Sequence, residues 1–358
     1  MKKTICLLIA LWLGLSVFAW LKPAEESSDS ERRNLGQFPE FSVKNLISGE
    51  FMGDFGDYAT DQFPLRDSWR RVNAYWSRYV LAQKDSDGIY LYDGHAAKME
   101  YPLDEKALSY AADRFDELYG MYLADSDCRV RFAVVPDKSR YLAEEAGVLA
   151  LDYEELNQKL ENRLDWAEFV DLSSCLSADS YYRTDPHWRQ ETLLPVVEAL
   201  GLNVSGEVAK QEATDEFYGV YCGQAALPMA PDDQDYLTFD GWEDVTVWSL
   251  DTGKTAGLYD FSKVESKDPY EFFLSGNMAL QVIENPHAKT DRELILFRDS
   301  FGSSLAPLLS RYYAKVPLID TRYMAPSMIG DYVNFEDQDV LFLYSTLVLN
   351  SSSALRKG

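Results

Sequence analysis

Apolar strands alternate with helical segments through much of the chain, and this alternation constrains the fold more than any other feature. Continuous apolar runs at 129–135 (RVRFAVV), 293–298 (ELILFR) and 339–345 (DVLFLYS) predict buried strands. Strands that lack a polar face are typical of a parallel sheet covered by helices on both sides. The sequence therefore predicts an α/β protein with a mainly parallel sheet in three layers.

Weaker patterns place other elements around this sheet. Helices are expected over 41–83, 106–123, 153–164, 188–200, 301–313 and 326–334, and further strands at 88–92, 168–172 and 315–319. Residues 205–290 break the rhythm with many Asp, Tyr and Gly residues and short alternating strands, so we interpret them as a β-rich insertion. With 46% apolar residues the chain has material for a large core, and we expect 41–358 to form one domain with this insertion.

The first residues follow the pattern of an export signal. Two lysines precede an apolar run from Ile5 to Leu21. This run is long for the apolar part of a cleaved signal and short for a membrane span, so residues 1–21 are predicted to be either a signal peptide or an uncleaved anchor. The polar residues 22–40 are expected to be a linker. Both alternatives place the protein outside the cytoplasm, either secreted or held at the cell membrane.

Charge and cysteine content restrict partners and cofactors. The formal net charge of −25 disfavours nucleic acid, because an acidic surface repels phosphates, and it disfavours docking of the folded domain on anionic lipid. Cys128, Cys175 and Cys222 lack metal-ligand spacing, so neither a metal nor another cofactor is expected. A disulfide between Cys128 and Cys175 is conceivable, but the sequence does not decide it.

Four aspartates of the insertion invite a calcium-binding interpretation: Asp232, Asp233, Asp235 and Asp240. Their spacing matches no EF-hand loop. We therefore favour a solvated acidic loop.

Asp185, Pro186 and His187 form a triplet that suits acid–base chemistry. Proline disfavours the α conformation in the residue before it, so Asp185 is expected to be extended. In an extended segment residues i and i+2 point to the same side, and the carboxylate can then orient the imidazole. The alternative is that Asp185 caps the following helix and His187 packs in the core, which the triplet alone slightly favours.

Ser300 lies between the predicted strand at 293–298 and the helix that follows it. This position is at the carboxyl edge of a parallel sheet, where α/β folds bind ligands, and the free N–H groups of a helix start suit an oxyanion. A lone serine there is more often a helix cap. Because His187 is the one histidine with a suitable neighbouring carboxylate, the two motifs together favour a Ser–His–Asp site.

These two segments carry a family resemblance. The stretches TDPHW (184–188) and RDSF (298–301) resemble the DHHW family of bacterial exported proteins, which is similar to the SGNH-hydrolase-like domains of alginate O-acetyltransferases. Further matching segments are DQFPLR (61–66), GIYL (88–91), VPDKSRY (135–141), FYGVY (217–221) and IDTRY (319–323). The resemblance implies an SGNH-like fold with Ser300 as nucleophile, His187 as base and Asp185 as the residue that orients the base.

The chain departs from the family pattern at three points. Pro186 replaces the first histidine of the naming block, and Arg298 stands where the family often has lysine. The glycine and asparagine of ordinary SGNH oxyanion blocks are not recognisable. Their function is then expected from the backbone N–H groups of Ser300 and Phe301, or from the side chains of Arg322 and Tyr323.

Five residues near predicted strand ends or the triplet are candidate substrate contacts: Arg322, Tyr323, Lys138, Tyr141 and Trp188. Surface packing is the alternative for Lys138 and Tyr141, and core packing is the alternative for Trp188.

The function that the resemblance implies is a serine-dependent O-acyltransferase or esterase acting on acetyl groups of a cell-envelope or secreted polysaccharide. Its partners would be that polysaccharide and a membrane acyl-donor protein, with the membrane reached only through the N-terminal segment. Two alternatives stay open. One is an inactive protein of the same fold that binds or assembles glycan, and the other is a structural envelope protein.

Overall fold

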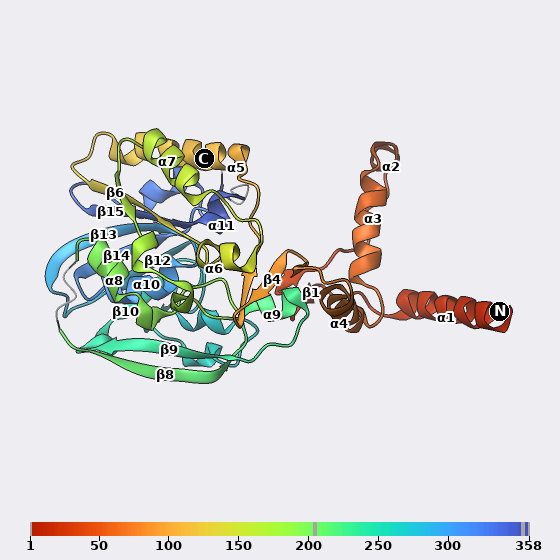
Figure 1. Cartoon of the computed structure of the whole chain (residues 1–358). Coiled ribbons are helices and arrows are strands. Elements are labelled where there is room, and N and C mark those ends of the chain that lie inside the picture. The colour runs from red at the N-terminus through yellow and green to blue at the C-terminus, as the bar shows by residue number, and fades with distance from the viewer. Residues whose placement is uncertain (1, 203–205, 352–354, 357–358) are drawn as a thin grey trace. The chain divides into compact units, whose positions relative to one another are not determined.

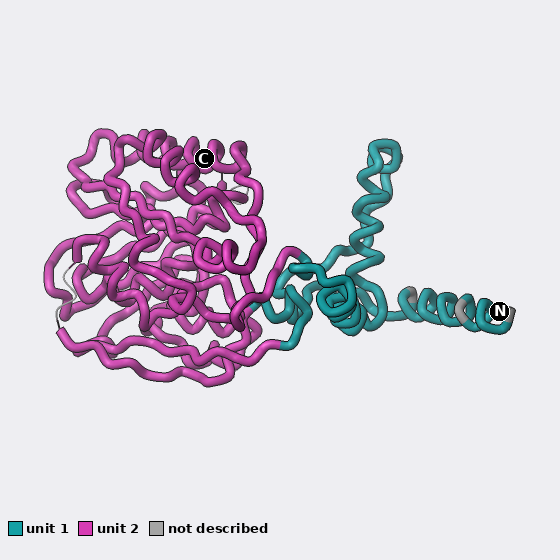
Figure 2. The backbone as a smooth tube through the Cα atoms, in the orientation of Figure 1, with its two compact units in different colours: residues 1–87, 220–228 teal, residues 88–219, 229–358 magenta. Residues whose placement is uncertain are grey.

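The computed structural model describes residues 2–202, 206–351 and 355–356. The chain divides into two compact units (Figure 2): residues 1–87 with 220–228, and residues 88–219 with 229–358. The domain start predicted at residue 41 lies inside the first unit.

An eight-stranded sheet forms the centre of the second unit (Figure 1). In spatial order its strands are β11 (Thr255–Ala256), β10 (Thr246–Ser249), β12 (Leu280–Glu284), β14 (Tyr313–Ile319), β13 (Thr290–Arg298), β15 (Asp339–Ser345), β6 (Arg129–Val135) and β7 (Glu168–Asp171). The five strands from β14 to β7 run parallel, and β12, β10 and β11 continue the sheet in antiparallel fashion. The predicted mixed α/β fold with a mainly parallel sheet is confirmed.

Both faces of this sheet are buried, which explains why its strands are apolar throughout. Along β15, Phe342 and Tyr344 pack into one hydrophobic cluster, while Leu341 and Leu343 pack into another. The first cluster contains residues of α5 (Glu105–Leu118), α7 (Tyr153–Arg163) and α11 (Thr346–Leu349). The second contains residues of α8 (Leu194–Ala199) and α10 (Gly302–Leu309). The three layers follow from this alternation.

The segment predicted as a β-rich insertion forms two separate pieces of β-structure. β8 (Val208–Phe217) and β9 (Asp232–Phe239) form a long antiparallel ribbon, whereas β10, β11 and β12 join the large sheet. Short helical turns connect these strands: η6 (Trp242–Asp244), η7 (Phe261–Lys263) and η8 (Pro269–Phe272). The segment therefore extends the main sheet as well as adding a ribbon.

The remaining elements of the second unit are short. They are the hairpin β4 (Ile89–Tyr92) and β5 (His95–Lys98), η2 (Tyr119–Leu123), α6 (Ser139–Ala146), η3 (Ser173–Cys175), η4 (Ala178–Ser180), η5 (Gln190–Thr192) and η9 (Pro326–Asp331). The helix predicted over 188–200 is wrong at its start. Trp188 is extended and bridges Tyr181, because the chain turns back at the Asp-Pro-His triplet, and the α-helix begins at Leu194.

The first unit is built from helices and a two-stranded ribbon. These elements are α1 (Lys2–Leu21), β1 (Ser27–Ser28), β2 (Arg33–Asn34), α2 (Val43–Ser48), α3 (Glu50–Asp61), α4 (Arg66–Tyr75), η1 (Trp76–Val80) and α9 (Val220–Ala225), and the short strand β3 (Asp85–Ser86) lies in the same unit. Residues 22–40, predicted as a linker, are tied to α3, since the Arg33 guanidinium donates two hydrogen bonds to Asp61 at 2.6 and 2.8 Å. This partner holds the pKa of Asp61 at about 2.

Two further observations concern the N-terminal segment and the cysteines. Over residues 2–202, 206–351 and 355–356, no helix has the length and apolarity needed to cross a membrane. Cys128 and Cys175 are both reduced thiols, so the disulfide considered between them is not formed.

Candidate active site

Ser300 lies in the tight turn that joins β13 to α10, at the carboxyl edge of the parallel strands. The buried Asp299 carboxylate fixes this turn. One of its oxygens accepts the N–H of Phe301 at 3.0 Å, and the other accepts the N–H and the hydroxyl of Ser345 at 2.8 and 2.6 Å. The serine is thereby held between the ends of two neighbouring strands.

Asp185, His187 and Ser300 are brought together. His187 Nδ1 lies 2.6 Å from Asp185 Oδ1, and His187 Nε2 lies 2.8 Å from Ser300 Oγ. Because a carboxylate accepts hydrogen bonds, Nδ1 is the protonated nitrogen, and Nε2 is left to accept the serine hydroxyl. The Asp185 side chain is 1% exposed and that of His187 is 13% exposed. The arrangement is that of a nucleophile, a base and a residue that orients the base.

The loop that carries Asp185 is held by Lys138. The Lys138 ammonium donates to the carbonyl oxygens of Tyr182, Arg183 and Asp185 at 2.7, 3.1 and 2.9 Å. Lys138 is 1% exposed, so its charge is satisfied inside the protein. This placement corrects the interpretation of Lys138 as a substrate contact: a buried ammonium directed at three backbone carbonyl oxygens positions the loop.

A second support of the same loop comes from β9. The Asp232 carboxylate accepts the N–H groups of Arg183 and Thr184 at 3.0 and 2.9 Å, and the Thr184 hydroxyl at 2.6 Å. Asp235 is also buried and pairs with Lys210 at 2.8 Å. The interpretation of these aspartates as a solvated loop is wrong for both residues, because each has a partner distant in sequence.

Gly219 packs directly against this loop. Its N–H donates to the Thr184 hydroxyl at 2.9 Å. A Cβ at this position would collide with the Thr184 carbonyl oxygen and with Asp185 Cβ. Only glycine allows so close an approach, so the glycine within FYGVY has a structural reason.

Tyr270 stacks on the imidazole, and sequence reasoning missed it. The rings of His187 and Tyr270 lie 3.7 Å apart between centroids, with planes 8° from parallel. The Tyr270 hydroxyl donates to Ser304 Oγ at 2.9 Å, and burial raises the pKa of Tyr270, which keeps this hydroxyl protonated. The only sequence signal for this contact is the large number of aromatic residues around Tyr270.

Trp188 is a core residue. It is fully buried, and its indole Nε1 donates to the Phe301 carbonyl oxygen at 3.0 Å and to Ser304 Oγ at 2.9 Å. This corrects its interpretation as a sugar contact, since its ring is not accessible. Tyr141 is half-buried, and its hydroxyl donates to the Ser173 carbonyl oxygen at 2.9 Å.

Arg322 and Tyr323 follow β14 at the same edge as Ser300. The Arg322 guanidinium makes two hydrogen bonds to Asp320, at 2.9 and 2.6 Å, and lies 5.4 Å from the centre of the Tyr323 ring. The Tyr323 side chain is 47% exposed. Tyr323 therefore keeps the accessibility that a substrate contact requires, whereas the Arg322 side chain is 17% exposed.

The oxyanion donors differ from the expectation in one respect. The Phe301 N–H donates to Asp299, so it is not available to an oxyanion. The Ser300 N–H has no hydrogen-bond partner within the described part of the chain. It can therefore donate to an oxyanion.

Asn277 is a further donor that the sequence did not reveal. The buried Arg298 guanidinium donates to Asn277 Oδ1 at 2.6 Å and to Gln281 Oε1 at 2.9 Å. Because a guanidinium only donates, Asn277 must turn its carbonyl oxygen toward Arg298 and its NH₂ group away from it. Asn277 is exposed, and its oxygen lies 3.5 Å from the hydroxyl of Ser303 in the first turn of α10.

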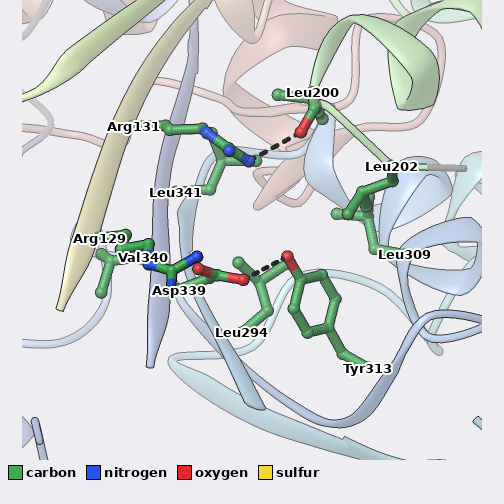
Figure 3. Close-up of a pocket in the computed structure, with 10 residues that line it drawn as sticks. All are labelled: Arg129, Arg131, Leu200, Leu202, Leu294, Leu309, Tyr313, Asp339, Val340 and Leu341. Atoms are coloured by element: carbon green, nitrogen blue, oxygen red, sulfur yellow. Dashed lines mark hydrogen bonds between the residues drawn. The ribbon is translucent and has the colours of Figure 1, made fainter. Parts of the chain in front are cut away.

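A small cavity lies at the other end of the parallel strands (Figure 3). It is lined by Arg129, Arg131, Leu200, Leu202, Leu294, Leu309, Tyr313, Asp339, Val340 and Leu341. Its volume of about 10 Å³ suits at most one water molecule. Tyr313 and Arg131 close it through hydrogen bonds to Asp339 and to the Leu200 carbonyl oxygen, both at 2.8 Å. This cavity has no part in the Ser300 site.

Comparison with known proteins places the fold. No family model and no curated protein matches the chain. A DHHW family protein from Eubacterium siraeum has a similar structure, with a TM-score of 0.59 and 21% identity over 75% of this chain and 94% of that one. PatB1 from Bacillus cereus, solved with a sulfonyl adduct, gives 0.54 and 16% over 73% and 97%.

A third solved structure, the O-acetyltransferase domain of AlgJ from Pseudomonas putida, gives a TM-score of 0.44 and 12% identity over 74% of this chain and 92% of that one. The first two likenesses show a shared fold, which confirms the expected resemblance to a DHHW family protein. The third is too distant to add to this conclusion.

Replacing Lys138 with methionine is expected to destabilise the protein. The substitution keeps the aliphatic stem but removes the ammonium from the carbonyl oxygens of Tyr182 and Asp185, while that of Arg183 keeps the Ala96 N–H at 2.7 Å, so we expect the free energy of unfolding to fall by about 2 kcal/mol. Urea denaturation measures this loss. The exposed Lys254→Met serves as the matched control and should stay within about 0.5 kcal/mol of the wild type. Equal stability of the two variants would contradict the assigned role.

Proposed function

We propose that this protein is an exported serine-dependent O-acyltransferase or esterase that acts on acetyl groups of a cell-envelope or secreted polysaccharide. The observation that carries the proposal is the pair of contacts on His187, 2.6 Å to Asp185 and 2.8 Å to Ser300. Export and the polysaccharide substrate rest on the N-terminal sequence pattern and on the DHHW resemblance. A membrane acyl-donor protein remains the proposed second partner.

The first half of the reaction starts with the His187 proton on Nδ1, next to Asp185, and with Nε2 facing Ser300. His187 Nε2 accepts the Ser300 proton while Ser300 Oγ forms a bond to the acyl carbonyl carbon of the donor. The carbonyl electron pair moves to oxygen, and Asp185 stabilises the imidazolium. When the carbonyl re-forms, the bond to the leaving oxygen breaks and that oxygen takes the proton from Nε2. The acyl group is then an ester of Ser300.

The second half repeats these steps with another nucleophile. His187 deprotonates a sugar hydroxyl or a water, which attacks the acyl-serine, and Ser300 recovers its proton from Nε2 as it leaves. A sugar acceptor makes the protein a transferase, and water makes it an esterase. The sequence and the fold are equally compatible with both acceptors.

We assign the oxyanion site to the Ser300 N–H, the Asn277 NH₂ group and the Arg322 side chain. Each is a hydrogen-bond donor at the edge of the sheet that carries Ser300. Arg298 and Asp320 hold two of them, since Arg298 orients the amide of Asn277 and Asp320 orients the guanidinium of Arg322. Fixed donors of this kind stabilise the charge that develops on the carbonyl oxygen. Tyr323 is proposed to contact the substrate beside them.

The sulfonyl adduct of PatB1 supports the proposal that a protein of this fold can carry a nucleophilic residue. A sulfonyl group becomes attached to a protein when a nucleophile displaces the leaving group of the reagent. PatB1 shares the fold of the present chain at 16% identity, so the adduct is a precedent for the fold and not for the residue.

A second candidate is a glycan-binding protein of the same fold without turnover. The occupied Phe301 N–H favours it, because one of the two expected backbone donors is missing from the oxyanion site. Glycan binding that is unchanged by Ser300→Ala, with no acetyl ester cleaved or transferred, would establish this alternative.

The acyl-serine predicts a burst of product. With p-nitrophenyl acetate, we expect about one equivalent of p-nitrophenol per protein before a slower steady state, since deacylation follows acylation. Ser300→Ala should abolish the burst and reduce turnover by about 10³-fold or more. The exposed Ser351→Ala is the control and should match the wild type. A burst that survives Ser300→Ala would overturn the assignment of the nucleophile.

Tyr270 is expected to act through His187 as a positioning residue. Its ring holds the imidazole plane and offers a π face to the imidazolium, an interaction of about 0.5–2 kcal/mol, so Tyr270→Leu should lower kcat roughly 2- to 30-fold. KM should change little, because Tyr270 is buried and does not reach substrate. Tyr270→Phe keeps the ring and should recover most of the rate.

Proton NMR separates this role from a general packing effect. The His187 Nδ1–H bonded to Asp185 should give a low-field signal in the wild type and in Tyr270→Phe, and the signal should broaden or vanish in Tyr270→Leu. An unchanged signal and rate in Tyr270→Leu would remove Tyr270 from the site.

A further inference from the structure

Helix α4 and the π-helical turn η1 expose a continuous apolar face. Six large apolar or aromatic side chains between 69 and 80 are 46% to 68% exposed: Trp69, Val72, Tyr75, Trp76, Tyr79 and Val80. They recur at intervals of three and four residues, so they share one side of the helix. This spacing predicts a helix, and the structure adds that its apolar side faces outward.

The opposite side of the same helix faces the interior of the first unit, and it is polar or small. Ala74 and Ser77 are 1% and 9% exposed. Arg70 donates to the carbonyl oxygens of Gly223 and Gln224 at 3.0 and 2.7 Å, and Arg66 forms an ion pair with Glu31. A helix on the surface of a protein in water normally shows the reverse orientation. A side this rich in exposed apolar groups marks an interaction surface.

The composition of the exposed face points to lipid. Tryptophan and tyrosine prefer the interface between hydrocarbon and water, and amphipathic helices that lie in that interface combine them with basic residues. Besides Arg66 and Arg70, which are tied within the unit, residues 66–84 hold three basic residues, Arg71, Arg78 and Lys84, and one acidic residue, in a chain whose net charge is −25. Arg71 lies exposed between the two sides of the helix, where it can reach anionic headgroups while the aromatic rings are buried.

The charges of the neighbouring segments differ from those of this face. The hairpin of α2 and α3 also exposes apolar groups, among them Ile47 and Met52, but it carries Glu50, Asp54 and Asp57 and would be repelled by anionic lipid. Apolar α1 approaches the start of α4, since Trp12 contacts Phe63 with ring centroids 6.2 Å apart. The basic aromatic face thus continues an apolar surface that is already exposed in the same unit.

We propose that the exposed face of α4 and η1 lies in the headgroup region of an anionic lipid bilayer. Trp69, Trp76 and Tyr79 would enter the interface, while Ala74, Ser77 and Arg70 keep their contacts within the unit. The helix would lie along the bilayer surface and would not cross it. This inference does not depend on the activity of Ser300.

Quenching of tryptophan fluorescence by brominated lipids tests the proposal on the full chain. Trp12→Phe and Trp20→Phe first remove the tryptophans of α1, so that six of the eight remain. With vesicles of brominated phosphatidylcholine and phosphatidylglycerol, we expect about a third of the emission to be quenched, from Trp69 and Trp76. Vesicles without phosphatidylglycerol should give weaker quenching.

Two variants decide the outcome. Adding Trp69→Phe and Trp76→Phe should remove the quenched fraction, and Trp76→Ser with Tyr79→Ser should weaken it severalfold. The control pair Leu149→Ser and Phe261→Ser changes exposed apolar groups of the second unit and should leave quenching unchanged. Absence of quenching, or quenching that survives Trp69→Phe and Trp76→Phe, would overturn the proposal. A dimer in light scattering without quenching would assign the face to a second copy of the chain.

Discussion

The hydrogen bond between His187 Nε2 and Ser300 Oγ is the contact on which the candidate site depends. It joins residues separated by 113 positions in the chain, one in a loop and the other in a turn after a central strand. Neither segment is regular secondary structure, so neither would hold a side chain in place unaided. Each is fixed by buried charged groups that bind backbone atoms. Lys138 and Asp232 hold the histidine loop, and Asp299 holds the serine turn.

The main effect of these buried charges is to fix the conformation of the loop and the turn, and their net contribution to the free energy of unfolding is secondary. A buried ion must lose its hydration, and its partners recover that loss only when all of its hydrogen bonds are satisfied. Lys138 donates to three carbonyl oxygens, and Asp299 accepts from three donors. Such centres tolerate few other arrangements of the chain around them. Tyr270 adds a ring that limits rotation of the imidazole, which leaves His187 with one productive orientation.

Short-range rules predicted the parts of this site that they govern. The restriction that Pro186 places on Asp185, and the position of Ser300 between a strand and a helix, were enough to propose that three side chains meet. The same rules failed for Trp188, Lys138 and Asp232, whose burial depends on partners far along the chain. Lys138 contacts residues 44 to 47 positions away, and Asp232 contacts residues 48 and 49 positions away. The helix expected from residue 188 failed for a related reason, since the bridge between Tyr181 and Trp188 is formed only when the loop closes.

Covalent labelling locates the nucleophile without knowledge of the natural substrate. The protein is treated with an arylsulfonyl fluoride at neutral pH, and its peptides are mapped by mass spectrometry. A Ser300 hydroxyl activated by His187 should displace fluoride and carry the sulfonyl group, and the labelling should be lost in His187→Ala while the fold is retained. A protein that stays unlabelled, or that carries the label elsewhere with Ser300 unmodified, would contradict the account.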